Sequence, residues 1–230
     1  SWFMAQAMSL KKDQLVTLIA AALTANLALL PYQDKLNESA RTLSQEQRRI
    51  ISKHPERSAT ALEEAGMENR ACLEVIREHH EKSDGTGYPR GLRGADISRE
   101  ARIVAAAERY VAMITRRAYR ARYRADEALR SMMSAAYDTG DRVVSQALYR
   151  ALGRYPPGVL VALHNGETAV VVRRAQSENP IEVRVLLNGQ GNAYHNPFER
   201  DTEQAEWRIE RIVVPDMLPA LDLPALWGYG

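Results

Sequence analysis

Hydrophobic residues recur three and four positions apart through most of the first 153 residues. The repeat is clearest in the ranges 15–23, 47–65, 68–80, 100–114 and 126–137. This spacing places the apolar side chains on one face of a helix. Ser44, with Gln47 three positions later, and Ser98, ahead of an apolar run, are residue types typical of helix N-caps. We therefore expect about five to seven amphipathic helices.

The pattern changes at Tyr-Pro-Pro-Gly, residues 155–158, where proline removes backbone donors and glycine loosens the chain. Beyond it, runs rich in β-branched residues occupy 159–164, 168–174, 181–187 and 207–214. Two of these runs lead into Asn-Gly pairs, which are typical of hairpin turns. We expect a mainly α fold, with a helical domain over 1–153 and a small antiparallel β appendage with a proline-rich tail over 154–230.

The composition is that of a globular protein, with 45% hydrophobic and 26% charged residues. The single cysteine, Cys72, cannot form an intramolecular disulfide, which favours a reducing compartment. The longest apolar run, 16–30, is shorter than the roughly 20 residues that span a bilayer, and it contains Thr24 and Asn26. We interpret it as a buried helix, and we expect a cytoplasmic protein without a membrane partner.

Positive charge is concentrated in one part of the chain. Residues 77–124 contain twelve Lys or Arg and six Asp or Glu, a balance of 12 − 6 = +6, whereas the whole chain carries only +2. The segment 116–124 alone contains five arginines and two tyrosines. Such asymmetry indicates an acidic or phosphate-bearing partner, and the alternative is a solvated basic helix face. A nucleic-acid binder is less favoured, because the whole chain is close to neutral.

The segment HHEKSDGTGYP, residues 79–89, combines tandem histidines with a glycine-rich turn. Metal-assisted hydrolysis of a phosphodiester requires imidazoles and carboxylates gathered from several helices. His79 and His80 offer two imidazoles, and His54 offers a third from the preceding helix. The alternative for these histidines is a structural role at a helix end or turn. His164, before an Asn-Gly turn, and His195, which we expect in a polar loop, are interpreted as exposed bystanders.

The stretch HHEKSDGTGYPRGLRG resembles the signature of the HD-GYP family, bacterial metal-dependent phosphodiesterases that hydrolyse cyclic di-GMP. The similarity extends through 53–62, 97–120 and 155–172. It implies an HD-type helical bundle whose first helices precede this chain. The resemblance places histidine metal ligands at His54, His79 and His80, and an acidic ligand at Glu108, where the family has aspartate. It also places ligand contacts at Tyr88, Arg117 and Arg120.

The motif that names the family is missing. The family usually has Ala-Leu-Leu-His-Asp-Ile-Gly-Lys, where this chain has Ala-Leu-Thr-Ala-Asn-Leu-Ala-Leu over 22–29. Ala25, Asn26 and Leu29 therefore replace histidine, aspartate and lysine, and no histidine in the 230 residues is followed by aspartate. We expect no catalytic residues here and no dinuclear centre, because asparagine lacks the charge that holds two divalent cations together.

From these substitutions we predict a catalytically degenerate HD-GYP module. It would serve regulation, ligand sensing or protein interaction in bacterial cyclic di-GMP signalling. It would carry no metal, or one divalent ion (Fe, Mn, Zn or Ni) at His54, His79, His80 and Glu108. The loop residues expected to bind a ligand or partner are Asp84, Gly85, Gly87, Tyr88 and Pro89. The resemblance implies a GGDEF-type diguanylate cyclase as the protein partner and cyclic di-GMP as the ligand. The alternative hypothesis is a phosphodiesterase with a reduced, one-metal site.

Overall fold

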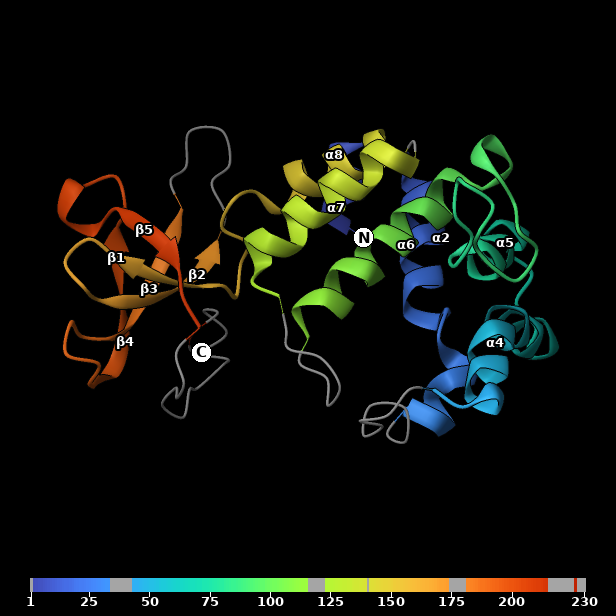
Figure 1. Ribbon diagram of the computed structural model, residues 1–230, viewed down its shortest axis with the longest axis horizontal. Coiled ribbons are helices and arrows are strands. Elements are labelled where there is room, and N and C mark those ends of the chain that lie inside the picture. Colours follow the sequence, from blue (N-terminus) through green and yellow to red (C-terminus); the bar gives the residue numbers. More distant parts are fainter. Residues whose placement is uncertain are drawn as a thin grey trace. The chain divides into compact units, whose positions relative to one another are not determined.

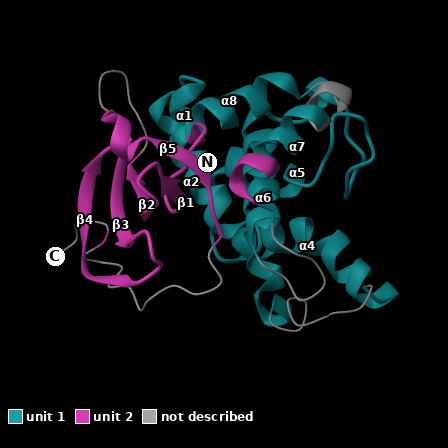
Figure 2. Ribbon diagram, turned by 60° about the vertical axis from the view of Figure 1, so that its left-hand side comes forward, with its two compact units in different colours: residues 1–123, 128–151 teal, residues 124–127, 152–230 magenta. Residues whose placement is uncertain are grey.

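The computed structural model describes residues 2–33, 43–115, 123–139, 141–173, 181–214 and 226, and for residues 2 and 135–139 it describes the backbone only. The chain divides into two compact units, one formed by 1–123 and 128–151 and the other by 124–127 and 152–230 (Figure 2). Arg117 and Arg120, most of the basic segment 116–124, and nearly all of the proline-rich tail lie outside the described residues.

The described part of the chain contains seven α-helices, which confirms the expected helical fold (Figure 1). They are α1 (Trp2–Ala7), α2 (Lys12–Thr24), α4 (Gln45–Glu64), α5 (Arg70–Glu78), α6 (Arg99–Ile114), α7 (Ala125–Thr139) and α8 (Arg142–Leu152). Three short 3-10 helices, η1 (Leu27–Tyr32), η2 (Gly94–Asp96) and η3 (Ala205–Trp207), complete the helical elements. Helix α5 packs against α2, α4 and α6.

Local capping explains where these helices begin. The Ser44 hydroxyl accepts a hydrogen bond from the Gln47 backbone N–H, and the Gln47 side chain returns a bond to the Ser44 N–H. Ser98 likewise caps α6 through the Ala101 N–H. These caps, both expected from the sequence, satisfy N–H groups that the first helical turn leaves without a partner.

The apolar run 16–30 is not a single buried helix as expected. Helix α2 ends at Thr24, and the run continues into η1. One face is buried through Leu18, Ala21, Ala25 and Leu29, while Leu23 is 81% exposed. Lys12–Tyr32 has the length and apolar composition of a membrane span, but soluble core helices pass the same test, so this likeness is weak.

The second unit contains one antiparallel sheet with the strand order β4-β3-β2-β1-β5. Its strands are β1 (Leu160–Leu163), β2 (Thr168–Arg173), β3 (Glu182–Leu187), β4 (Ala193–Asp201) and β5 (Ile209–Ile212). Alternate residues of β1, β2 and β3 form its core: Val161, Leu163, Ala169, Val171, Val183 and Val185. The small antiparallel appendage is thereby confirmed.

Strand β4 was missed by the sequence reasoning, and His195 was wrongly placed in a loop. His195 lies within β4, although its side chain is exposed as expected. The strand escaped notice because its residues are mainly polar and include Pro197. Proline removes a ladder donor but is tolerated on an edge strand, and β4 forms one edge of this sheet.

Candidate functional site

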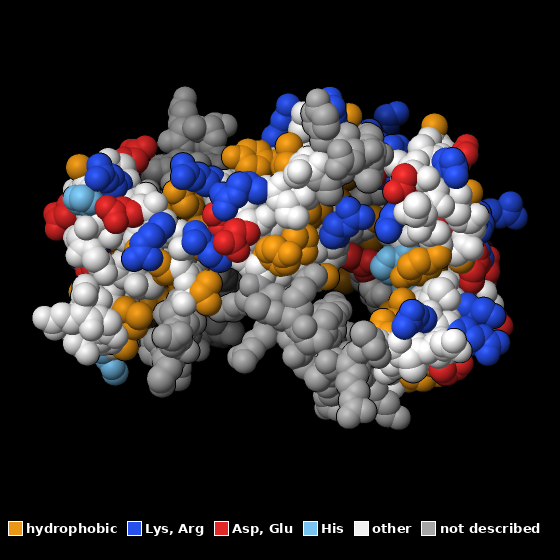
Figure 3. All heavy atoms as spheres, in the orientation of Figure 1, with side chains coloured by type: hydrophobic (Ala, Val, Ile, Leu, Met, Phe, Trp, Pro, Cys, Tyr) orange, Lys and Arg blue, Asp and Glu red, His pale blue; other side chains and the backbone are white. Residues whose placement is uncertain are grey.

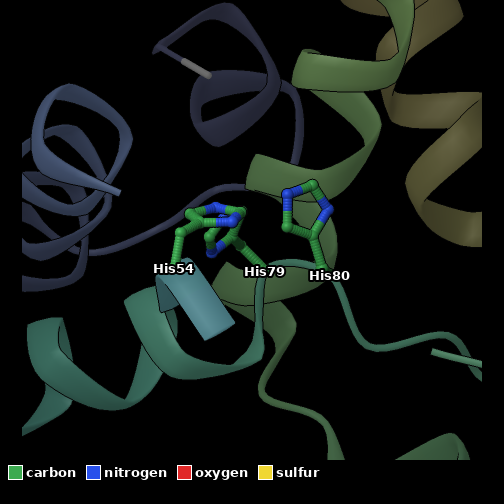
Figure 4. Close-up of side chains that lie close together, drawn as sticks. All are labelled: His54, His79 and His80. Carbon is green, nitrogen blue, oxygen red and sulfur yellow. The ribbon is translucent and has the colours of Figure 1, made fainter. Parts of the chain in front are cut away.

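Three histidines from two helices meet inside the helical unit. His54 lies within α4, and His79 and His80 directly follow α5. Figure 4 shows the three imidazole rings gathered together, and their candidate ligand atoms all lie within 4.8 Å of one another. His54 and His79 are only 1% and 0% exposed, whereas His80 is partly exposed. The structure therefore brings together the three histidines that the sequence singled out.

Backbone carbonyls orient two of these rings. Pro55 lies inside α4 and has no N–H, so the carbonyl of Ile51, four residues earlier, lacks its usual helical partner. The His54 Nδ1 atom lies 2.6 Å from that oxygen. At the end of α5 the Ile76 carbonyl is likewise free of a helical partner, and the His79 Nδ1 atom lies 2.6 Å from it. Because a carbonyl only accepts, both Nδ1 atoms carry the hydrogen.

This tautomer leaves the two Nε2 lone pairs facing each other. The His54 and His79 Nε2 atoms are 3.1 Å apart in a buried environment. Burial lowers the pKa of each imidazole to about 4, so a proton is not retained between them at neutral pH. A metal ion fits this arrangement, because ligating histidines usually donate their other ring N–H to a carbonyl. Converging imidazoles suit divalent zinc, iron or nickel.

Glu108, in α6, lies beside the histidines. Its Oε2 atom is 3.7 Å from the His79 Nε2 atom and 4.0 Å from the His80 Nε2 atom. Its Oε1 atom accepts a hydrogen bond from the Asn26 side-chain amide. Burial raises the pKa of the Glu108 carboxyl, although the bond from Asn26 opposes this shift. The structure thus joins the acidic candidate to the cluster and reveals a partner for it that the sequence did not indicate.

The other two substituted positions of the missing motif line or support the same region with apolar groups. Ala25 is completely buried, and Leu29 is 8% exposed. Neither side chain offers a metal ligand or a cation. The substituted segment 22–29 therefore contributes to the site mainly through the amide of Asn26.

The loop after α5 folds back onto the histidines. The buried Glu81 carboxylate accepts hydrogen bonds from the backbone N–H groups of Arg90, Gly91 and Leu92, which closes the loop. The Tyr88 N–H donates to the His80 carbonyl, and the Tyr88 ring stacks on the His80 ring with centroids 4.8 Å apart. The role of Glu81 was missed, although its position directly after the histidines was a usable signal.

The remaining loop residues keep the turn in shape. The Asp84 carboxylate accepts hydrogen bonds from the Thr86 N–H and hydroxyl, so it is used within the loop. Gly85 has φ +79°, in the left-handed region. A Cβ atom on Gly87 would lie 2.4 Å from the Lys82 backbone nitrogen, so this position requires glycine. Pro89 follows Tyr88 through a cis peptide bond.

A cavity of about 790 Å³ opens over this cluster. Its polar lining includes the three histidines, Glu108, Tyr88 and Asn26, with Lys82 and Arg109 also present. Its apolar lining includes Ala22, Leu29, Ile51, Val104 and Ala112. Figure 3 shows a histidine surface set in a hollow of the helical unit, with acidic and hydrophobic side chains around it. Lys82 and Arg109 were not singled out by the sequence reasoning.

Comparisons with known proteins agree with this geometry. The HD domain family model matches residues 2–144. The chain is 29% identical over 165 residues to cyclic di-GMP phosphodiesterase PdeB of Borreliella burgdorferi, covering 72% of this chain and 43% of that protein. It is 36% identical over 126 residues to cyclic di-GMP phosphodiesterase PA4108 of Pseudomonas aeruginosa, covering 54% of this chain and 30% of that protein. It therefore spans less than half the length of either relative.

A solved structure shares the fold. Bd1817, an HDGYP protein from Bdellovibrio bacteriovorus, superposes with a TM-score of 0.52 at 23% identity, covering 63% of this chain and 46% of that one. The family model spans most of the helical unit, and the segment 79–89 carries the His-His-Glu and Gly-Tyr-Pro elements of the signature. The chain therefore belongs to the HD domain family, in its HD-GYP branch.

Proposed function

We propose that this chain is a catalytically degenerate HD-GYP module of bacterial cyclic di-GMP signalling, which acts in the cytoplasm through ligand or protein binding. The observation that carries the proposal is the hydrogen bond from the Asn26 amide to Glu108. At the position where the family has a charged metal ligand, this chain presents a neutral N–H donor. The donor is directed at the Glu108 carboxylate, which lies beside the histidines.

A pair of divalent cations held side by side needs a bridging carboxylate, whose negative charge offsets their mutual repulsion. Asn26 carries no such charge, and its N–H group occupies a Glu108 oxygen that would otherwise be available to a cation. Ala25 supplies no imidazole, and Leu29 supplies no cation for a phosphate. These three substitutions lie within five consecutive residues, 25–29, and all weaken the same step, the hydrolysis of the phosphodiester.

The remaining donors support retention of a single ion. His54, His79 and His80 would hold it, with Glu108 alongside, and a bound divalent ion would supply Lewis acidity toward a phosphate oxygen. The facing Nε2 atoms of His54 and His79 are the specific support for this part of the proposal. The proposed ion is Fe, Mn, Zn or Ni, and metal analysis of the purified chain distinguishes among them.

The loop 82–92 is the proposed docking surface for a protein partner, a diguanylate cyclase of the GGDEF type. Its backbone is fixed by Glu81, independently of the metal ligands' own side chains. Asp84 and Thr86 are exposed on this loop. Loss of hydrolytic residues at positions 25, 26 and 29 would therefore leave the surface intact.

The second candidate function is a phosphodiesterase that works with one metal ion. The convergence of three imidazoles on one point favours it, because a mononuclear centre with an open position can activate water. It differs from the first proposal in a measurable way, since it requires turnover that depends on His54 and His79.

The experiment that tests both candidates combines metal analysis with a hydrolysis assay. The purified chain, loaded with Mn²⁺ or Fe²⁺, is incubated with cyclic di-GMP, and linear dinucleotide and GMP are quantified. We expect at most one metal ion per chain and no turnover above a His54→Ala/His79→Ala control. Two ions per chain, or turnover on the scale of seconds, would overturn the degenerate module; turnover with one ion, lost in the control, would establish the second candidate.

A further inference from the structure

Among the described residues, two cations at the cavity lack the acidic partners that Arg77 of the same unit has. Lys82 and Arg109 both line the cavity, and both side chains are exposed. Within the described ranges of the chain, neither makes an ion pair or a side-chain hydrogen bond. In the same unit Arg77 is paired with Glu56, Glu63 and Glu74. The difference indicates that the two cavity cations are available to a ligand.

The backbone holds Lys82 in a fixed place beside the histidines. It lies two residues after His80, and its carbonyl accepts a hydrogen bond from the Gly85 N–H at 2.7 Å. Gly87 packs so closely that only a glycine fits against the Lys82 nitrogen. A lysine on such a fixed turn loses less backbone entropy when it binds a ligand than one on a free loop.

Arg109 approaches the same place from α6, directly after Glu108. Arg109 and Lys82 line the same cavity as His80. Both cations therefore border the space into which the histidines open. Leu29, which also lines the cavity, carries no charge.

We propose that Lys82 and Arg109 form the phosphate-binding pair of this cavity, and that they supply from the loop and α6 the positive charge that Leu29 cannot supply. The inference rests on the proposed function for its ligand, a cyclic dinucleotide. An ammonium and a guanidinium both bind phosphate oxygens through charge-assisted hydrogen bonds. The apolar lining of the cavity suits the faces of the bases.

The test compares two charge-matched double variants of the full chain. K82Q/R109Q removes the two cavity cations, and K12Q/R70Q removes two exposed cations of the same unit that do not line the cavity. Titration calorimetry with cyclic di-GMP, and separately with inorganic phosphate, is carried out on wild type and both variants. Metal content and thermal unfolding are recorded for each, so that loss of fold or of the histidine cluster is recognised.

We expect K82Q/R109Q to bind cyclic di-GMP about tenfold or more weakly than wild type, with unchanged metal content, and K12Q/R70Q to bind as wild type does. Equal affinity in wild type and K82Q/R109Q, or equal weakening in both variants, would overturn the inference. If wild type does not bind cyclic di-GMP, this dinucleotide is not the ligand. The titration with inorganic phosphate then tests whether Lys82 and Arg109 bind phosphate. Phosphate binding that K82Q/R109Q loses supports the pair, whereas phosphate binding that it keeps, or that wild type lacks, overturns it.

Discussion

Both units bury a cluster of ionisable side chains, and the two clusters differ in how their polar atoms are paired. In the sheet unit, the Glu167 Oε1 atom accepts from the Tyr194 hydroxyl and the Arg200 Nη2 atom, and its Oε2 atom accepts from the Arg200 Nε atom. The Arg200 guanidinium also lies over the rings of Phe198 and Trp207, 4.7 Å and 4.6 Å from their centroids. The Glu167 charge is thereby paired, and both of its oxygens are hydrogen-bonded within the protein.

The helical unit shows the opposite arrangement. His54 and His79 use their Nδ1 atoms on backbone carbonyls and direct their Nε2 atoms at each other. No described side chain donates a hydrogen to the space between those two atoms. A polar cluster that is complete by itself stabilises a fold, whereas one whose lone pairs converge without a donor is typical of a ligand site.

Arg200→Met should give the largest effect, because it leaves the Glu167 carboxylate buried without its counter-charge. We expect the free energy of unfolding to fall by about 2–4 kcal/mol, measured by denaturant titration. Arg173→Met, which removes an exposed arginine paired with Glu182, should cost less than about 1 kcal/mol. Equal losses in the two variants would mean that the Glu167 cluster is not the stabilising element described here.

His79→Ala tests the incomplete cluster. We expect the affinity for Zn²⁺, measured by calorimetry, to fall by about 100-fold or more, since one of three converging imidazoles is lost. His164→Ala, which removes an exposed histidine bonded to Glu210 in the sheet unit, should leave the affinity unchanged. If His79→Ala binds Zn²⁺ as wild type does, the facing Nε2 atoms are not a metal site.

Asn26→Asp should leave the polar groups of the helical cluster less well paired in the metal-free chain. The substitution replaces the amide donor to Glu108 by a second carboxylate, and like charges repel unless a cation lies between them. We expect the metal-free chain to lose about 1 kcal/mol of stability and Mn²⁺ to bind about tenfold more tightly. Thermal unfolding with and without Mn²⁺ measures both effects, and an unchanged Mn²⁺ response would contradict the assigned role of Asn26.

The Glu167 cluster should also give the sheet unit a pH dependence. Burial alone would raise the pKa of Glu167, but hydrogen bonds from Arg200 and Tyr194 lower it below its ordinary value of 4.5. The unfolded chain therefore takes up a proton before the folded one, so the stability is present above pH 4.5 and is lost as the pH falls through the lowered pKa. In unfolding measured between pH 6 and pH 3, Glu167→Gln should show a smaller decline than wild type. A parallel decline would assign the loss to other carboxylates.

The sequence predicted the secondary structure correctly where a few neighbouring residues suffice to specify a helix, a cap or a turn. Helical periodicity and the serine caps located α4 and α6, because capping satisfies the first N–H groups within a few residues. The hairpin of β1 and β2 at Asn165-Gly166 was equally local. Strand β4 was not found, because a polar edge strand is specified by the neighbour it pairs with and not by its own composition.

By itself, the sequence determined that three histidines and Glu108 are present, that the His-Asp pair is missing, and that the Gly-Tyr-Pro loop is complete. Only the tertiary structure decided that the Asn26 amide meets Glu108 and that the His54 and His79 Nε2 atoms face each other at 3.1 Å. It also decided that Lys82 and Arg109 line one cavity. The first two of these contacts join residues that are 82 and 25 positions apart in the sequence. Helix packing brings such residues together in space, and no local sequence pattern encodes it.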